Sequence, residues 1–526
     1  MVTVDNGLDC GRLPCRSTDS SSSAPAPAGL QLGYYLQQAG CDYLALERTD
    51  APAEFFRRFP RHRKLISINK VHTKSEDPEI RLRWDWNSLL QEPFELPFGD
   101  YSREYFPHAD DLVRYLTDFQ ERHRLNVAFG VDVQRIVKTE DGFTVHTSGE
   151  TYTCQSLIMA AGWGKPNIPA IEGIEHAIGY EDMSTDPADY TDHRVLILGK
   201  GNSAFETASS MLGHAAMIHL ASPNFTKLAW NTKHPGDVRG HHGAVLDSFH
   251  FKTLHSVLDC TVDYIKPVGD KFEVHITYTH AEGETAVMEY ESVIRCTGFA
   301  MDTSVFDDGC KPEMVPSGRL PTVQPDWQST NVDGLYFAGT ISQARDFKKA
   351  SSAFIDGFRY NLRTLTALLR ERYESVPLAF DTVQVGPDAL TKLILDRVNW
   401  SSALWTQFEF LVDTLVIDED GTARHHIDLP EEYAIERFGS TSEHYYTFGL
   451  WWGRDAYPDV FGIERHPRPE LAAESAFIHP VIRRYRGGEK VAELHLLEDL
   501  LADWRRPDRH IDPLRAFFET ELDQKR

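Results

Sequence analysis

The sequence has few basic residues and few cysteines for its length, and it lacks a long apolar run. Its 526 residues include 54 Lys and Arg against 79 Asp and Glu, which gives a formal net charge of -25. This balance argues against a nucleic-acid binder, because neutralising phosphates needs a dense basic surface. No stretch approaches the roughly 18 apolar residues of a membrane-spanning helix, and the N-terminus lacks the apolar core of a secretory signal. We therefore expect no nucleic-acid partner and no membrane span.

The seven cysteines are scattered, odd in number and never spaced Cys-x-x-Cys. They predict neither a disulfide framework nor a zinc cluster, and they offer no dithiol relay. Several lie in apolar, strand-like runs, where a small core residue is the simplest interpretation. We expect a cytoplasmic protein. The pattern Gly-x-Ser-x-Gly is also absent, so nothing indicates a hydrolase.

The residues that are present alternate between strand and helix patterns up to about residue 375, after a Ser- and Asp-rich stretch at 1–23. Such alternation is typical of an α/β fold with parallel sheets. The region 376–526 changes character, and we expect it to be mixed and mainly helical, with the aromatic run 445–452 packed in its core. Helices are expected at 28–39, 110–122, 204–212 and 354–373, and strands at 42–47, 131–147 (a hairpin), 152–161, 194–198, 217–221, 293–297 and 335–339.

The clearest motif is a glycine-rich turn between a strand and a helix. Gly199, Gly201 and Ala204 follow the apolar strand 194–198 in the spacing Gly-x-Gly-x-x-Ala. The first glycine permits the tight turn, the second lets the backbone approach a pyrophosphate, and the small third residue lets the helix pack on the strand. A dinucleotide site with its phosphates on the helix N-terminus is therefore predicted, with a plain tight turn as the alternative.

The preference for NADPH or NADH stays open at this site. An arginine just after the second strand, at 221–224, would favour the 2′-phosphate of NADPH, and none is present. Lys227 lies near, and Ser222 offers a hydrogen-bond donor.

A second dinucleotide site near the N-terminus is incomplete. Gly29 opens a helix, and Glu47 lies about 20 residues on, at a strand end, where a carboxylate holds a ribose hydroxyl. Ala24 and Ala26 stand where the first two glycines belong, and the polar residues before them cannot form a buried strand. Residues 1–27 are either a disordered tail or a mis-predicted exon or frameshift, since Gly-Ala-Gly-Pro in GC-rich codons reads Ala-Pro-Ala-Pro one nucleotide out of frame.

These features occur in the order found in FAD-dependent pyridine-nucleotide oxidoreductases, which the chain resembles. More narrowly, it is similar to flavoproteins associated with degradation in the endoplasmic reticulum, which are relatives of flavin-containing monooxygenases. Met183 stands where the monooxygenase fingerprint has a histidine, and no retention signal ends the chain, so we expect a cytosolic relative. The similarity extends from Ala28 to about Tyr373, and its blocks are 59–70, 85–90, 105–107, 201–206, 236–239 and 354–360, with 477–480 in the weaker C-terminal part.

The resemblance implies two Rossmann-like, three-layer dinucleotide-binding domains, with the nucleotide domain inserted in the FAD domain. The expected division is an FAD-binding domain at 28–168 and 291–375, an NAD(P)-binding domain at 169–290 and a C-terminal domain at 376–526. The cofactors implied are FAD and NADPH or NADH. The cofactor-binding residues implied are Gly29, Glu47, Gly339 and Thr340 for FAD, and Gly199, Gly201, Asn202, Ser203 and Ala204 for the nicotinamide nucleotide. Gly162 and Gly298 are implied as further cofactor-binding residues.

The resemblance also places Asn69 over the flavin, as the candidate catalytic residue. It is either a donor that holds a flavin hydroperoxide for transfer to a nucleophilic substrate or an ordinary turn asparagine. Asp237 and Arg239 either anchor their loop by an ion pair or meet the nucleotide. Five histidines between 234 and 255 lack zinc-site spacing, so we expect solvated loop residues and no metal.

Three functions remain from the sequence. The first is an NAD(P)H-dependent monooxygenase that passes a hydride to FAD and then uses oxygen on a small nucleophilic substrate. The second is an NAD(P)H oxidase or reductase with another acceptor. The third is a partner-binding flavoprotein scaffold in protein quality control, whose C-terminal domain binds other proteins.

Overall fold

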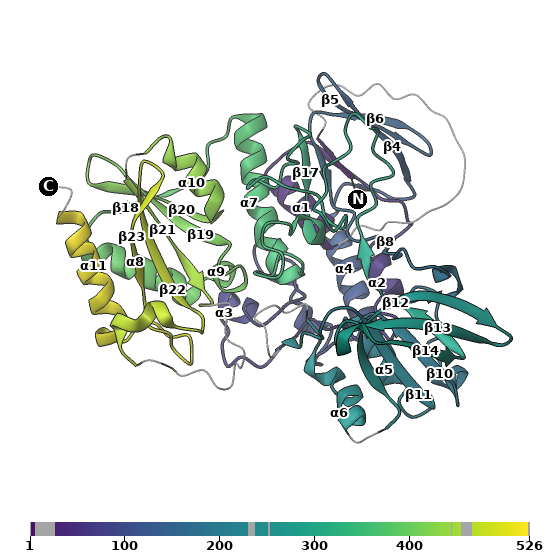
Figure 1. The fold of residues 1–526 in the computed structure, drawn as a ribbon. Helices are drawn as coiled ribbons and strands as arrows, with labels where there is room; N and C mark the ends of the chain where they lie inside the picture. Colours follow the sequence, from purple (N-terminus) through teal and green to yellow (C-terminus); the bar gives the residue numbers. More distant parts are fainter. Residues whose placement is uncertain are drawn as a thin grey trace.

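The computed structural model describes residues 2–5, 27–229, 237–250, 253–442, 444–453, 465 and 467–523. It arranges them as a first domain, an inserted domain and a C-terminal domain, with the long helix α7 (Ile355–Glu374) between the first and the last (Figure 1). Within these ranges no helix is long and apolar enough to cross a bilayer.

The first domain has three layers around a five-stranded sheet of order β17-β7-β1-β2-β3. Alternate strand residues point to opposite faces, so Ile158 and Tyr336 pack among helices, whereas Met159 and Phe337 pack on a three-stranded meander. The helices are α1 (Pro27–Gln38), α4 (Ala109–His123) and α7. The strands are β1 (Val2–Asp5), β2 (Tyr43–Leu46), β3 (Val127–Ala128), β7 (Leu157–Met159) and β17 (Leu335–Phe337), with the meander β4 (Val133–Thr139), β5 (Gly142–Thr147) and β6 (Thr151–Cys154).

Strand β1 corrects the prediction that residues 1–27 lie outside the fold. Val2–Asp5 fills the central slot of the sheet and pairs antiparallel with both β2 and β7. A gap between β2 and β7 would leave the backbone N–H and C=O groups along both strand edges without hydrogen bonds. An extended segment can form these hydrogen bonds whether it runs parallel or antiparallel to its neighbours. The prediction failed because it looked for the strand directly before α1. Residues 6–26, where Ala24 and Ala26 lie, are outside the described residues.

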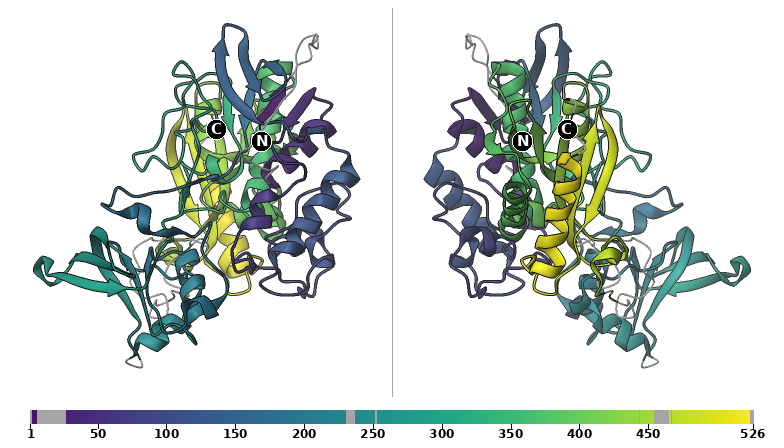
Figure 2. Two further views of the ribbon diagram at one scale, coloured as in Figure 1. Left: turned by 90° about the vertical axis from the view of Figure 1, so that its right-hand side faces the viewer. Right: turned by 90° about the vertical axis from the view of Figure 1, so that its left-hand side faces the viewer.

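The inserted domain is built on a seven-stranded sheet of order β14-β13-β12-β11-β10-β15-β9. Its β12–β14 ribbon projects away from the other domains (Figure 2). Helix α5 (Asn202–Met211) packs on the sheet, and α6 (Ala244–His250) follows later in the chain. The strands are β9 (Ile178–Gly179), β10 (Arg194–Leu198), β11 (Met217–Ser222), β12 (Ser256–Val268), β13 (Lys271–Tyr278), β14 (Thr285–Tyr290) and β15 (Ser292–Arg295).

Two short strands carry the chain between these domains. Lys165–Pro166 (β8) leads into the inserted domain, Phe299–Ala300 (β16) leads out of it, and the two pair antiparallel. Strand β15 pairs in parallel with β10, so it belongs to the inserted sheet and not to the FAD domain, whose predicted second segment starts at residue 291. The sequence shows that β15 is a buried strand, but an apolar run does not say which sheet it joins.

The C-terminal domain is mixed, but its centre is a six-stranded sheet of order β18-β20-β19-β21-β22-β23, so the prediction of a mainly helical region is wrong. The aromatic run is confirmed as packing, since Tyr445, Tyr446 and Phe448 of β21 are buried. Its strands are β18 (Asp381–Gln384), β19 (Leu411–Ile417), β20 (Thr422–Pro430), β21 (His444–Trp451), β22 (His479–Arg486) and β23 (Glu489–His495), and its helices are α8 (Pro387–Trp400), α9 (Ser402–Thr406), α10 (Glu431–Gly439) and α11 (Asp512–Asp523).

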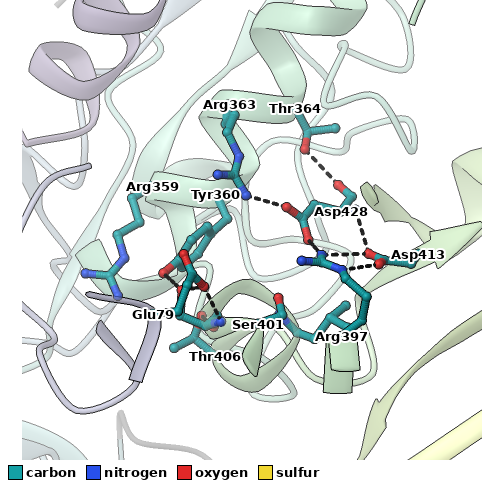
Figure 3. Close-up of polar contacts among 12 residues, drawn as sticks. Glu79, Arg359, Tyr360, Arg363, Thr364, Arg397, Ser401, Thr406, Asp413 and Asp428 are labelled. Atoms are coloured by element: carbon teal, nitrogen blue, oxygen red, sulfur yellow. Dashed lines mark hydrogen bonds and ion pairs between the residues drawn. The ribbon is translucent and has the colours of Figure 1, made fainter. Parts of the chain in front are cut away.

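Buried charges join this domain to α7 (Figure 3). Arg363 of α7 makes an ion pair with Asp428 of β20. Arg397 of α8 binds Asp413 of β19 at 2.5 Å and reaches Asp428 at 3.3 Å. Glu79, from the first domain, accepts hydrogen bonds from the backbone and hydroxyl of Ser402. The C-terminal domain is therefore attached through buried aspartates that bind two partly exposed arginines.

Candidate functional site: two nucleotide-binding edges and the contact between them

The glycine-rich turn of the inserted domain has the geometry of a phosphate cradle. Gly199 follows β10 with φ of +126°, and a Cβ there would lie 2.3 Å from the carbonyl oxygen of Cys296. Glycine is required because the neighbouring strand end leaves no room for a side chain. Gly201, the N-cap of α5, has open space beside it, so a ligand can approach its backbone. Ala204 is fully buried and allows close helix–strand packing.

Asn202 and Ser203 open helix α5, and Asn202 also holds a second loop. Its Nδ2 donates to the carbonyl oxygen of Asp237 at 3.3 Å, and its Oδ1 accepts from the backbone N–H of Arg239 at 3.1 Å. Residues 237–239 of the family block therefore lie beside the N-terminus of α5. The motif residues Gly199 to Ala204 stand together as the sequence predicts.

Lys200 inside the turn serves the structure of the inserted domain. Its ammonium is buried in an ion pair with Asp259 and donates to the carbonyl oxygen of Asn224 at 3.1 Å. Asn224 lies in the stretch after β11 where the residue that distinguishes NADPH from NADH is expected. The ion pair thus fixes that stretch against the turn, a contact that the sequence did not reveal.

Glu47 lies at the carboxyl end of β2, where the sequence predicts an adenosine contact. Its side chain is fully buried. Oε1 accepts from the backbone N–H and the hydroxyl of Thr49, both at 2.9 Å, whereas Oε2 has no hydrogen-bond partner in the described ranges. Burial raises the pKa of Glu47 to about 7. A buried carboxylate oxygen without a donor fits a ribose hydroxyl that would donate to it.

Gly339, Thr340 and Gly29 gather at the same edge of the first domain. Gly339 follows β17 with φ of +71°, and a Cβ there would lie 2.4 Å from the Cβ of Ala28 in the first turn of α1. The Thr340 hydroxyl donates to the carbonyl oxygen of Ala353 at 3.0 Å. This close approach brings β17 onto the N-terminus of α1, which suits a phosphate-bearing ligand.

The two other predicted glycines lie where the chain passes between the domains. Gly162 precedes β8 and has open space around its α-carbon. Gly298 precedes β16, and its carbonyl oxygen accepts from the backbone N–H of Asn167 at 2.9 Å. The residues present therefore fit the adenosine end of FAD at Glu47 and a close approach at Gly339. Asp5 ends β1 at the opposite edge, beside Tyr43, and residues 6–26, which follow, lie outside the described residues.

Asn69 is buried and holds a neighbouring loop. Its Nδ2 donates to the carbonyl oxygens of Ser102 at 2.7 Å and Glu104 at 3.3 Å. Its backbone N–H donates to the carbonyl oxygen of Tyr105 at 2.9 Å. These contacts favour the turn interpretation, and the role of Asn69 over the flavin stays a prediction.

A buried polar chain links the two domains beside α5. The hydroxyl of Tyr180 donates to the carboxylate of Glu206 in α5 and accepts from the backbone N–H of Arg61 at 2.8 Å. Burial raises the pKa of Glu206 to about 7. The Nη2 of Arg61 donates to the carbonyl oxygen of Met183, whose side chain is buried. The position at which monooxygenases have a histidine is thus an apolar core position in this chain.

The expectation of solvated histidines at 234–255 is wrong for His242 and His255, which are each 7% exposed. The Nδ1 of His255 accepts from the backbone N–H of Ile218, because this segment folds back on β11. His242 is buried where the inserted domain meets the first domain, a contact that a single sequence does not show. In the described ranges no group of three or more metal-binding side chains could hold a metal ion. His234 lies outside them.

The chain matches known proteins over most of its length. The family model described as pyridine nucleotide-disulphide oxidoreductase matches residues 26–339. FAD-dependent oxidoreductase domain-containing protein 2 of Mus musculus is 34% identical over 94% of this chain and 83% of the relative. The protein of the same name from Danio rerio is 32% identical over 94% of this chain and 82% of the relative.

Solved structures share the fold of the two nucleotide-binding domains. A flavin-containing monooxygenase from Stenotrophomonas maltophilia aligns with a TM-score of 0.50 and 20% identity, over 66% of this chain and 97% of that one. An ornithine N-hydroxylase from Kutzneria sp. 744 aligns with a TM-score of 0.50 and 15% identity, over the same shares. The glycine turn, the Glu47 edge and these matches agree. The chain belongs to the pyridine nucleotide-disulphide oxidoreductase family and is an FAD-dependent oxidoreductase, with FAD and NADPH or NADH as its cofactors.

Proposed function

We propose that the protein transfers a hydride from NADPH or NADH to FAD and uses oxygen as the final acceptor. One oxygen atom goes to a small nucleophilic substrate and the other leaves as water. The observation that carries the proposal is that one chain holds two nucleotide-binding edges, the Gly199 turn and the Glu47 edge, in domains joined by β8 and β16. FAD supplies the redox chemistry when bound. The protein's residues bind the two nucleotides, orient them and exclude water.

The cysteines favour oxygen over a disulfide as the acceptor. The sequence contains no Cys-x-x-Cys pair that could relay electrons. Cys296, the cysteine beside the Gly199 turn, is buried, and burial raises the pKa of its thiol well above the usual range. A thiol held protonated is a poor nucleophile. We also propose a reducing compartment such as the cytoplasm, since Cys260, Cys296 and Cys310 carry free thiols.

A second candidate is an NAD(P)H oxidase that releases peroxide. Asn69 favours it, because its side-chain amide nitrogen already donates to the carbonyl oxygens of Ser102 and Glu104. An amide committed in this way does not offer a hydrogen bond to an oxygen adduct. Protein partners of the C-terminal domain remain a further prediction.

The test is the visible spectrum of the purified protein, recorded without oxygen before and after addition of NADPH or NADH. The flavin band near 450 nm should bleach with one of the two nucleotides. Oxygen uptake without an equal amount of peroxide then supports the monooxygenase, and equal amounts support the oxidase. An FAD-containing protein that neither nucleotide reduces contradicts both functions.

A further inference from the structure

Basic side chains cluster where the first and inserted domains meet, although the whole chain has a net charge of -25. We call this cluster the basic seam. One group belongs to the segment after α2 (Glu54–Arg58) in the first domain, and the other to the turn before α6 in the inserted domain. The members of the basic seam are Arg61, His62, Lys64, Arg239, His241 and His242.

Ring contacts hold the second group against the first domain, where His62 lies close to His242 and Lys64 to His241. The Arg239 guanidinium lies over the ring of Trp86, at 5.2 Å from its centroid. The rings of His241 and Phe106 lie 4.6 Å apart. Trp86 and Phe106 belong to the first domain, so the turn at 239–242 is held across the contact between the domains.

Arg239 is fixed in position but is not satisfied. Its backbone N–H is bound by Asn202, and its guanidinium rests on Trp86. Its Nε and Nη2 atoms are buried and have no hydrogen-bond partner among the described residues. Donors of a buried guanidinium that lack an acceptor cost free energy, which a bound acceptor would recover.

The carboxylates near Arg239 make no ion pair with it in the described ranges. Asp237 is paired instead with Lys348, at 3.1 Å between Oδ1 and Nζ. Asp356, in the first turn of α7, lies within electrostatic reach of Arg239, but burial raises the pKa of Asp356 to about 7. In the described part of the chain no carboxylate makes an ion pair with Arg239. The guanidinium of Arg239 in the basic seam is therefore available to bind an anion.

Two histidines beside Arg239 are also unsatisfied. His242 is 7% exposed, and its Nε2 has no hydrogen-bond partner in the described ranges, nor does the Nε2 of His62. Burial, with smaller contributions from the neighbouring His241, His62 and Arg239, lowers the pKa of His242 to about 4. His242 is therefore neutral at pH 7, and the Nε2 atoms of His242 and His62 can each donate to a bound anion when they carry the ring proton.

We propose that Arg239, His62 and His242 form a binding site for an anionic oxygen group, a carboxylate or a phosphate, at the contact between the two domains. The guanidinium supplies the fork of donors that such groups accept. The site lies beside the N-terminus of α5, so its interpretation rests on the proposed function. Two sources can supply the anion: a phosphate of the nicotinamide nucleotide, or an acidic group of the substrate.

The test is calorimetric titration of the FAD-loaded protein with inorganic phosphate, and with NADPH and NADH in the presence and absence of phosphate. Arg239→Gln is expected to weaken phosphate binding by about tenfold or more, because it removes hydrogen bonds to a charged group. Arg103→Gln removes the same charge from an exposed position and should bind phosphate like the unchanged protein. Arg239→Lys keeps the charge but lacks the paired N–H donors of the guanidinium, so its affinity for phosphate should fall several-fold. This variant tests the site if Arg239→Gln fails to fold.

The outcomes separate the two sources. Phosphate that competes with the nucleotide assigns the anion to the nucleotide, and phosphate that binds alongside it assigns the anion to the substrate. Equal phosphate binding by the unchanged protein and both Arg239 variants, or no phosphate binding at all, overturns the proposal. Phosphate titration involves no turnover, so a protein that binds phosphate through Arg239 without being reduced by NADPH or NADH would refute only the proposed function.

Discussion

Glu47 is a buried carboxyl whose ionisation should lower the stability of the FAD-free protein. Its pKa is raised from 4.5 to about 7 by burial, so the folded protein holds this proton more tightly than the unfolded chain does. Its contribution to stability is therefore fully present below pH 4.5 and is lost as pH rises through about 7. Glu47→Gln should stabilise the FAD-free protein by about 1–3 kcal/mol at pH 8 and by much less at pH 5. Urea unfolding at the two pH values measures this difference.

The substitution Glu47→Gln should also weaken the binding of FAD. The Oε2 of Glu47, which has no hydrogen-bond partner among the described residues, is expected to accept from a ribose hydroxyl. A charged acceptor binds more strongly than a neutral amide. Glu47→Gln should therefore raise the dissociation constant for FAD by about tenfold at pH 8. Glu150→Gln, an exposed change of the same kind, should leave both quantities unchanged. Unaltered FAD affinity in Glu47→Gln would remove Glu47 from the site.

Gly199 and Gly201 allow a matched pair of substitutions in the phosphate cradle. Gly199→Ala puts a methyl group 2.3 Å from the carbonyl oxygen of Cys296, at a φ that side chains disfavour, so it should destabilise the fold by about 2 kcal/mol or more. Gly201→Ala meets open space, so it should keep the melting temperature but weaken nicotinamide nucleotide binding. Thermal unfolding and nucleotide titration distinguish the two variants. Equal losses of stability would contradict the assignment of separate roles.

At the scale of elements, the ion network between α7, α8 and β20 contains buried carboxylates that the arginines of the two helices stabilise (Figure 3). Arg397→Met leaves Asp413 and Asp428 buried without their shared cation, which should cost about 3–5 kcal/mol. Lys392→Met removes an exposed cation from the same helix, whose pair with Asp396 is open to water, and should change stability by less than about 1 kcal/mol. Urea unfolding compares the two variants, and a small effect of Arg397→Met would show that water reaches the network.

The elements that the sequence predicts are those whose pattern is local. The helix 110–122 shows a helical apolar periodicity, and the strand–turn–helix around Gly199 is marked by an apolar run followed by glycines. The structure contains both. Strand β20 carries His425 and Asp428 at buried positions, so its apolar alternation is lost and a sheet was not expected. Strand β1 depends on a distant slot in the sheet that only the folded chain provides.

The residues of the candidate site also fall into those that the sequence could predict and those that it could not. Glu47 and Gly199 could be predicted because each stands at a fixed distance from a strand end that the sequence shows. The burial of Arg239 and His242 could not, because it arises when residues 239–242 meet Trp86 and Phe106, more than a hundred positions earlier in the chain. Contacts between domains leave no periodic trace in a single sequence.

At the scale of the whole molecule, the C-terminal domain supports the Gly339 edge of the first domain. Gln407 follows α9 and is fully buried. Its Oε1 accepts from the backbone N–H of Ser351 at 2.9 Å, and its Nε2 donates to Ser352 Oγ at 2.8 Å and Asn361 Oδ1 at 2.6 Å. The residue after Ser352 is Ala353, whose carbonyl oxygen accepts from the Thr340 hydroxyl. One side chain of the C-terminal domain is thus two hydrogen bonds away from a predicted FAD contact.

Gln407→Leu tests whether that connection reaches the cofactor. Leucine has a similar size but satisfies none of the three partners, so the loop at 351–353 should loosen and release Thr340. We expect FAD affinity to fall by about tenfold and the absorption and fluorescence of the bound flavin to shift. Gln384→Leu on the exposed strand β18 is the control. A Gln407→Leu protein that loses stability but keeps its flavin spectrum and FAD affinity would confine the C-terminal domain to a supporting role in folding, whereas a shifted spectrum would make it part of the cofactor site.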